Sequence, residues 1–247
     1  MPIAIRQSAE GAPLAFERLG GAGPTLVWLG GFRSDMSGTK AEALHGWAQA
    51  RGRALLRFDY SGHGRSGGRF EEGSIGRWRA EALELLDGET EGPLVLVGSS
   101  MGGWIALLCA LARPLRIAGL TLVAPAPDFT ERLLWPALPE AARREILEQG
   151  QWLQPSAYAE APSPLTRTLF EGSRPWLLLD APSIPIAAPV RILHGQQDPD
   201  VPWTLSLELA EKLQSPDVAL TLIKDGDHRL SRPQDLARLL AAVAELA

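Results

Sequence analysis

Cysteine is almost missing from this sequence, and its scarcity already limits what the protein can be. A single cysteine among 247 residues excludes an internal disulfide and favours a reducing compartment. No apolar run reaches the ~20 residues that a membrane-spanning helix needs. No basic stretch followed by an apolar one stands at the N-terminus, so we expect neither a signal peptide nor a transit peptide and predict a cytoplasmic protein.

Signals for charged partners and inorganic groups are missing as well. A net charge of −5 leaves no basic surface for nucleic acid. No cluster of His, Cys, Asp or Glu has metal-ligand spacing, and there is no phosphate-binding P-loop, so we predict no metal and no cofactor. What the chain does have is 45% hydrophobic residues, enough for a substantial core.

Strand patterns and helical patterns alternate along the chain. The alternation predicts an α/β fold, with a mostly parallel sheet and helices on both faces. Two short antiparallel strands are expected first, at residues 3–7 and 14–18. Core strands are expected at residues 25–29, 54–59, 94–98, 120–124, 190–194 and 219–223. Helices are expected at residues 39–50, 75–86, 102–112, 205–213 and 234–246.

One long segment, residues 125–188, interrupts this alternation of strand and helix patterns. It lies between two core strands, contains no obvious strand and is rich in proline and tryptophan. We predict that residues 1–247 form a single domain in which residues 125–188 are a helical cap over the active site. The apolar side chains of this segment either line an acyl pocket or pack the cap onto the body, and the two readings carry equal weight. These side chains are Phe129, Leu133, Leu134 and Trp135.

Residues 98–102, Gly-Ser-Ser-Met-Gly, join an apolar strand to an apolar helix. A serine at the centre of such a sharp turn presents its hydroxyl above the edge of the sheet. Side chains at Gly98 and Gly102 would collide with the neighbouring strand and helix. Centring the turn on Ser99 instead would put larger residues at the glycine positions. We therefore predict that Ser100 is a nucleophile.

A serine hydroxyl needs a histidine base that an acid orients. Of the four histidines, His45 lies in a helical pattern, His63 in a turn upstream of Ser100, and His194 at the end of a strand. Only His228 follows both the serine and an acid-bearing loop, which is the chain order Ser, Asp, His. We therefore predict that His228 is the base.

The acid is expected from residues 194–202, a loop that holds both Asp198 and Asp200. Aspartates commonly cap turns and helices, and Asp200 is expected to cap this turn or the helix that starts near residue 203. An oxyanion hole needs two backbone N–H groups. We expect them from Met101, at the start of the helix after the serine, and from Phe32, with Gly31 bordering the substrate.

These motifs together resemble the α/β-hydrolase superfamily of serine hydrolases along nearly the whole chain. The resemblance rests on Gly30-Gly31-Phe32, Asp59-x-x-Gly62-x-Gly64-x-Ser66, Gly98-x-Ser100-x-Gly102, Asp198 and His228. The family pattern His-Gly-x-x-Asp-x-x-Val-Pro aligns on Asp198, so the resemblance implies that Asp198 is the acid. A narrower resemblance, in residues 31–41, 57–62 and 227–229, is to the mitochondrial acyl-protein thioesterase branch, which is also described as an acyl-glucuronide esterase branch.

The resemblance implies a serine hydrolase that cleaves acyl esters or thioesters through an acyl-enzyme. Its substrate would be an acylated protein or a small-molecule ester. A general small-molecule carboxylesterase is the alternative within enzymes. The fold also serves as a ligand-binding scaffold without turnover, but the intact nucleophile, base and acid argue against that reading.

Overall fold

Eight strands form the central sheet of the computed structural model, which describes residues 3–154 and 162–247. Their order across the sheet is β1-β2-β4-β3-β5-β6-β9-β10. The pairs β1–β2 and β2–β4 are antiparallel, and every later pair is parallel. The strands are β1 (Ala4–Gln7), β2 (Pro13–Leu19), β3 (Ala22–Leu29), β4 (Arg53–Phe58), β5 (Leu94–Ser99), β6 (Ile117–Val123), β9 (Val190–Gly195) and β10 (Val218–Ile223).

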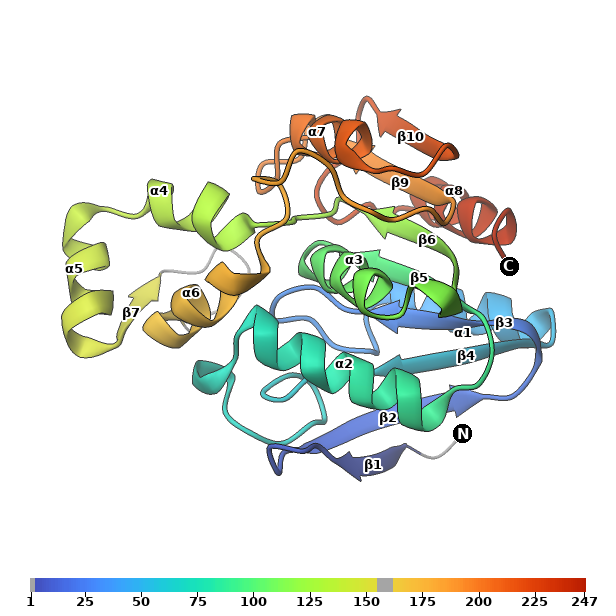
Figure 1. The fold of residues 1–247 in the computed structure, drawn as a ribbon, viewed down its shortest axis with the longest axis horizontal. Coiled ribbons are helices and arrows are strands. Elements are labelled where there is room, and N and C mark those ends of the chain that lie inside the picture. Colours follow the sequence, from blue (N-terminus) through green and yellow to red (C-terminus); the bar gives the residue numbers. More distant parts are fainter. Residues whose placement is uncertain (1–2, 155–161) are drawn as a thin grey trace.

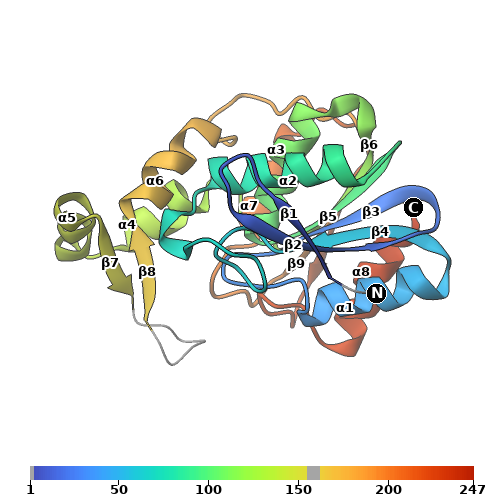
Figure 2. The same ribbon diagram turned by 90° about the horizontal axis from the view of Figure 1, so that it is seen from below.

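Helices cover both faces of this sheet (Figures 1 and 2). One face carries α2 (Ile75–Glu89), α3 (Met101–Ala112) and α7 (Thr204–Lys212), and the other carries α1 (Thr39–Ala50) and α8 (Pro233–Ala244). Alternate residues of a strand point to opposite faces. Val27 and Leu29 of β3 therefore belong to the first core, and Leu26 and Trp28 to the second.

The predicted α/β architecture is confirmed. Each predicted core strand and helix is present, with bounds that differ by a few residues at most. Central strands such as β5 read as nearly continuous apolar runs because a parallel strand is buried on both faces. In the part of the chain that the structure describes, no helix is long and apolar enough to cross a membrane.

The segment between β6 and β9 projects beside the main sheet (Figure 1). The sequence predicts no strand here, and this prediction is wrong, because two short strands pair antiparallel. Each has four residues, and Pro164 in the second cannot donate a ladder hydrogen bond, so the usual strand pattern is missing. Residues 155–161 of the predicted cap lie outside the described residues. The elements are α4 (Trp135–Ala137), α5 (Glu140–Gln149), β7 (Gln151–Gln154), β8 (Ser163–Thr166) and α6 (Arg167–Ser173).

Asp128 links the beginning of this segment to its far end. Its carboxylate accepts the backbone N–H groups of Leu178, at 2.8 Å, and Leu179, at 2.7 Å. Asp128 itself is buried and adopts a positive φ of 58°. Burial raises the pKa of the Asp128 carboxyl, although these two N–H groups favour the charged form. The two ends of the segment are therefore held together by a buried carboxylate.

Candidate active site

Ser100 lies on the turn between β5 and α3, with an unusual φ of 54° and ψ of −119°. Its N–H donates to Val123 O at 2.9 Å, which holds the turn against β6. A Cβ at Gly102 would lie 2.0 Å from Leu29 O, and one at Gly98 would lie 2.5 Å from Gly102 O. The predicted collisions of a side chain at residue 98 or 102 with neighbouring backbone are thus confirmed, and only glycine fits at these two positions.

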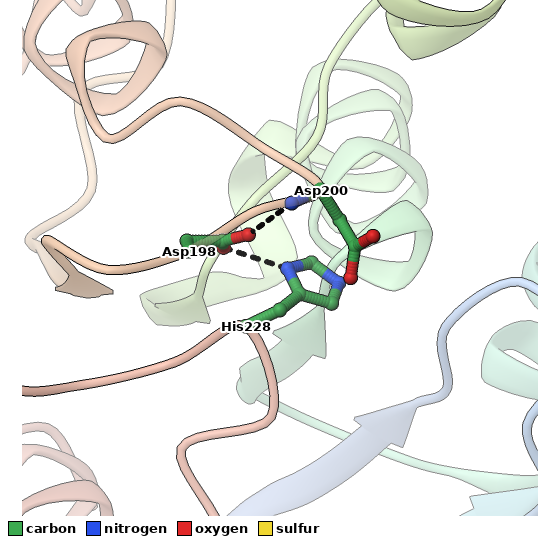
Figure 3. A group of neighbouring side chains, drawn as sticks. All are labelled: Asp198, Asp200 and His228. Carbon is green, nitrogen blue, oxygen red and sulfur yellow. Dashed lines mark hydrogen bonds and ion pairs between the residues drawn. The ribbon is translucent and has the colours of Figure 1, made fainter. Parts of the chain in front are cut away.

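The structure brings Ser100, His228 and Asp198 together from the C-terminal ends of three strands. His228 Nε2 lies 3.1 Å from Ser100 Oγ. His228 Nδ1 lies 2.7 Å from Asp198 Oδ2 (Figure 3). An ionised carboxylate only accepts, so Nδ1 carries the proton in this bond. Nε2 is then free to accept the hydroxyl proton of Ser100.

The side chain of Asp198 is fully buried and surrounded by donors. Its Oδ1 accepts the backbone N–H groups of Asp200 and Val201, each at 2.8 Å. Its Oδ2 accepts from His194 at 3.2 Å as well as from His228. Burial raises the pKa of this carboxyl, but the hydrogen bonds from His194 and His228 outweigh that effect and hold the pKa well below its ordinary value. Asp198 is therefore ionised at neutral pH.

His194 is the contact that reasoning from the sequence missed. Its imidazole is completely buried, with Nε2 also 3.0 Å from Val201 O and Nδ1 2.7 Å from Ser206 Oγ. Because a carboxylate and a carbonyl only accept, Nε2 carries the proton and Nδ1 accepts the Ser206 hydroxyl. The available signal was the spacing of four residues between His194 and Asp198 at the end of β9.

Asp200 is expected to cap either this turn or the helix that follows, and the structure excludes the helix cap. The residue before α7 is Trp203, and no side chain caps that helix. The turn is capped by Asp198, which accepts the Asp200 N–H. An Asp200 carboxylate oxygen lies within 4.8 Å of a ligand atom of His228 and of Asp198 (Figure 3). These are metal-ligand types, but a cation would have to compete with the bond between Asp198 and His228.

Of the two residues expected to supply the oxyanion-hole amides, Met101 follows Ser100 in the chain, and Phe32 lies in the loop after β3, which packs against Ser100. Met101 is the first residue of α3, where a backbone N–H has no partner within the helix. Phe32 follows Gly31, and a Cβ at Gly31 would lie 3.4 Å from Ser100 Cβ. The loop after β3 therefore lies directly against the serine, and Gly31 leaves the space there open.

The apolar residues expected in an acyl pocket are only partly brought together. Phe129 is buried, and its ring centroid lies 5.7 Å from that of Phe32 and 5.8 Å from that of Trp104. Leu133 is partly buried against the main core. The ring centroid of Trp135 lies 4.9 Å from that of Phe170 in α6. Trp135 also borders a groove of about 500 Å³ along α5. Among these residues, Phe129 is the one seen in contact with the loop beside Ser100.

The strand–turn–helix serine and the strand order define the class of this protein. It belongs to the alpha/beta hydrolase family, whose pattern matches residues 26–239. It is an enzyme that hydrolyses ester or thioester bonds.

Within this family, the chain is similar to a group of thioesterases and to two solved hydrolase structures. The mouse protein "Palmitoyl-protein thioesterase ABHD10, mitochondrial" is 40% identical over 234 residues, which cover 94% of this chain and 78% of the relative. The solved structure of a hydrolase from Agrobacterium vitis S4 matches with a TM-score of 0.94 and 43% identity, covering 100% of this chain and 99% of that one. Alpha/beta hydrolase domain-containing protein 10 from mouse matches with a TM-score of 0.91 and 38% identity, covering 100% of this chain and 98% of that one. The resemblance to the acyl-protein thioesterase branch is confirmed.

The prediction of a cytoplasmic location is wrong by the same comparison. The mouse, bovine and human relatives are all named as mitochondrial proteins. A single buried cysteine excludes an internal disulfide, but it does not distinguish one reducing compartment from another. Composition therefore could not decide the compartment.

Proposed function

We propose that this chain is an acyl-protein thioesterase that works through Ser100, His228 and Asp198 as a catalytic triad. The observation that carries this proposal is the unbroken line of hydrogen bonds from Ser100 Oγ to His228 and on to Asp198, at 3.1 Å and 2.7 Å. The ionised Asp198 holds His228 in the one neutral tautomer that can take the serine proton.

In the first half of the reaction, Ser100 Oγ attacks the acyl carbonyl while His228 Nε2 takes the hydroxyl proton. The N–H groups of Phe32 and Met101 donate hydrogen bonds to the carbonyl oxygen as negative charge develops on it. Removing one such donor costs about 100- to 1000-fold in rate in comparable enzymes. The dipole of α3 adds to this stabilisation because the oxyanion forms at its N-terminus.

The tetrahedral intermediate then collapses. The bond from the carbonyl carbon to the leaving sulfur or oxygen breaks, and His228 returns its proton to the leaving group. This gives an acyl ester on Ser100. A water molecule, deprotonated by His228, attacks that ester, and the second collapse releases the carboxylic acid and restores Ser100.

An S-acylated protein is the substrate class that the relatives support best, because the mouse and human proteins are named palmitoyl-protein thioesterases. We propose that residues 125–188 act as the cap that receives the acyl chain. Phe129 supports this role, since its ring packs against that of Phe32 at a centroid distance of 5.7 Å. Each methylene buried there would contribute at most about 0.8 kcal/mol.

The test is a comparison of thioesters and oxygen esters with the same acyl chain, an acyl glucuronide included. The proposal predicts specificity constants for thioesters at least equal to those for oxygen esters, because a thiolate leaves readily and the oxyanion hole contacts only the carbonyl. Ser100→Ala is the matched control and should abolish turnover of every substrate. Turnover confined to short oxygen esters would identify a general carboxylesterase instead.

A further inference from the structure

The imidazole of His63, in the loop after β4, connects this loop to the loop after β3, which lies against Ser100. Its Nε2 lies 3.2 Å from the backbone N of Arg33, and its Nδ1 lies 3.1 Å from Ser61 O. A backbone N–H only donates, so Nε2 must accept. A backbone carbonyl only accepts, so Nδ1 must carry the proton. The two bonds together require the neutral ring in a single tautomer.

The surroundings of His63 stabilise this neutral ring. The side chain is buried, and its ring centroid lies 5.8, 5.2 and 5.0 Å from those of Tyr60, Phe70 and Trp78. Burial lowers the pKa of His63 from its ordinary value of 6.5 to about 4, although the bond to Ser61 favours the charged form. The acceptor at Nε2 is therefore present throughout the neutral pH range.

The residue that His63 holds has a demanding backbone conformation. Arg33 has a φ of 60°, in the left-handed region that residues with a Cβ rarely adopt. Arg33 directly follows Phe32, whose N–H the proposed mechanism uses. Such a conformation persists only where the surroundings hold it in place.

The same turn anchors the loop at a second point. Asp59 accepts the N–H of Met36 at 2.7 Å and the N–H of Arg65 at 2.8 Å. Asp59 thus holds the far end of the loop after β3, while His63 holds the residue next to Phe32. The two anchors act on different peptide groups, and the one through His63 acts on the residue that follows Phe32.

We infer that His63 is a positioning residue for the oxyanion hole, which it shapes by accepting the Arg33 N–H and so fixing the loop that carries Phe32. This inference rests on the proposed function of Ser100 and Phe32. A misplacement of about 1 Å in a catalytic group can cost about 100-fold in rate. Losing the acceptor should therefore slow turnover without weakening the binding of the substrate.

The test compares two substitutions of the same residue. In His63→Gln the amide oxygen takes the place of Nε2 and can still accept, whereas His63→Leu has a similar volume and no acceptor. Ser66→Ala is the control for general loosening, because Ser66 Oγ bonds Ala15 N at 2.8 Å and Asp59 O at 2.6 Å in the same turn without touching Arg33. Folding is followed for each variant by its midpoint of thermal unfolding.

The inference predicts that His63→Leu lowers kcat by about 10- to 100-fold with KM changed less than about threefold. Binding of a boronic acid transition-state analogue should weaken by the same factor as kcat. His63→Gln should keep kcat within about fivefold of the wild-type value. Ser66→Ala should lower the unfolding midpoint but leave the affinity for the analogue within about threefold.

An equal loss of kcat in His63→Gln and His63→Leu would overturn the inference. So would a kcat that falls in proportion to the unfolding midpoint across all variants. A rise in KM with unchanged kcat would overturn it too. Hydrogen exchange of the Arg33 amide, measured by NMR, reports the hydrogen bond independently of activity and should be faster only in His63→Leu. A wild-type enzyme without Ser100-dependent turnover would instead overturn the proposed function, whatever the exchange rates.

Discussion

His194 donates its Nε2–H to Oδ2 of Asp198 over 3.2 Å, so the proposed catalytic acid is held by a second, completely buried histidine. The same oxygen accepts from His228 at 2.7 Å. With two imidazoles on one oxygen and two backbone N–H groups on the other, the Asp198 carboxylate has little freedom to rotate. The orientation of His228 therefore depends on His194 as well as on Asp198.

Replacing His194 with leucine should lower both activity and stability. Removing the buried donor should reduce the free energy of unfolding by about 1–3 kcal/mol. We expect kcat to fall about 10-fold, because His228 and two backbone N–H groups still hold Asp198. Ser206→Ala is the matched control, since it removes only the outer hydroxyl on His194 Nδ1, and kcat should stay within about threefold. Steady-state kinetics and urea unfolding measure both effects, and a larger loss of kcat in Ser206→Ala would contradict this account.

The proposed role of Asp198 as the acid is tested by exchanging each aspartate of the loop for asparagine. Asp198→Asn should reduce kcat by about 1000-fold or more, because the new amide favours the wrong tautomer of His228. Asp200→Asn should reduce kcat by less than about 10-fold. Asp200 contacts Asp198 through its backbone N–H, and the asparagine variant keeps this group. The same steady-state assay applies to both variants. The reverse order of effects would make Asp200 the acid.

The three residues of the proposed triad, which the structure brings together, could be selected from the sequence because their signals are local or follow chain order. Glycine is sterically required at residues 98 and 102 of one sharp turn. Such a turn can be recognised from a motif of five residues. His228 and Asp198 each follow a strand that the apolar pattern makes plain. In a parallel sheet the C-terminal ends of the strands meet at one edge, so residues that follow them are brought together.

The rest of the site depends on contacts that no local pattern encodes. His194 reaches both Asp198 and Ser206 of α7, and the roles of its two nitrogens follow only from the positions of those partners. The sequence places His63 only in a turn upstream of Ser100, whereas in the structure its ring nitrogens bond to backbone groups of two different loops. The strands β7 and β8 escape prediction because both are short and Pro164 in β8 cannot donate a ladder hydrogen bond.

Acid should destabilise the protein partly through His63. The pKa of His63 falls from 6.5 to about 4 on folding because of burial, so between these pH values the unfolded chain binds a proton that the folded chain does not. The free energy of unfolding should therefore decrease as the pH falls from 6.5 to 4, by about 3 kcal/mol at most from this residue.

The His63→Gln variant isolates this contribution, because glutamine does not titrate and every other acidic or basic group is unchanged. Urea unfolding at several pH values gives the free energy of unfolding of each protein. The value for the wild type minus the value for His63→Gln should decrease as the pH falls from 6.5 to 4. A constant difference over this range would mean that folding does not lower the pKa of His63.

Acyl-chain length tests the proposed role of residues 125–188. Specificity constants for thioesters from C2 to C16, measured below micelle formation, should rise several-fold or less for each two added carbons until the site is full, since each methylene contributes at most about 0.8 kcal/mol. Acetyl thioesters should still react, because the triad does not depend on the acyl site. A strict optimum at acetyl, with no activity beyond butyryl, would exclude an acyl site in this segment.

Direct detection of the acyl-enzyme tests the central claim. The protein is mixed with an excess of a long-chain acyl thioester, quenched in acid within the first turnover and digested for mass spectrometry. The account predicts a mass increase equal to the acyl group on Ser100, an unmodified peptide in Ser100→Ala, and normal acylation in Ser99→Ala. An adduct on Ser99, or continued thioester hydrolysis by Ser100→Ala, would contradict it.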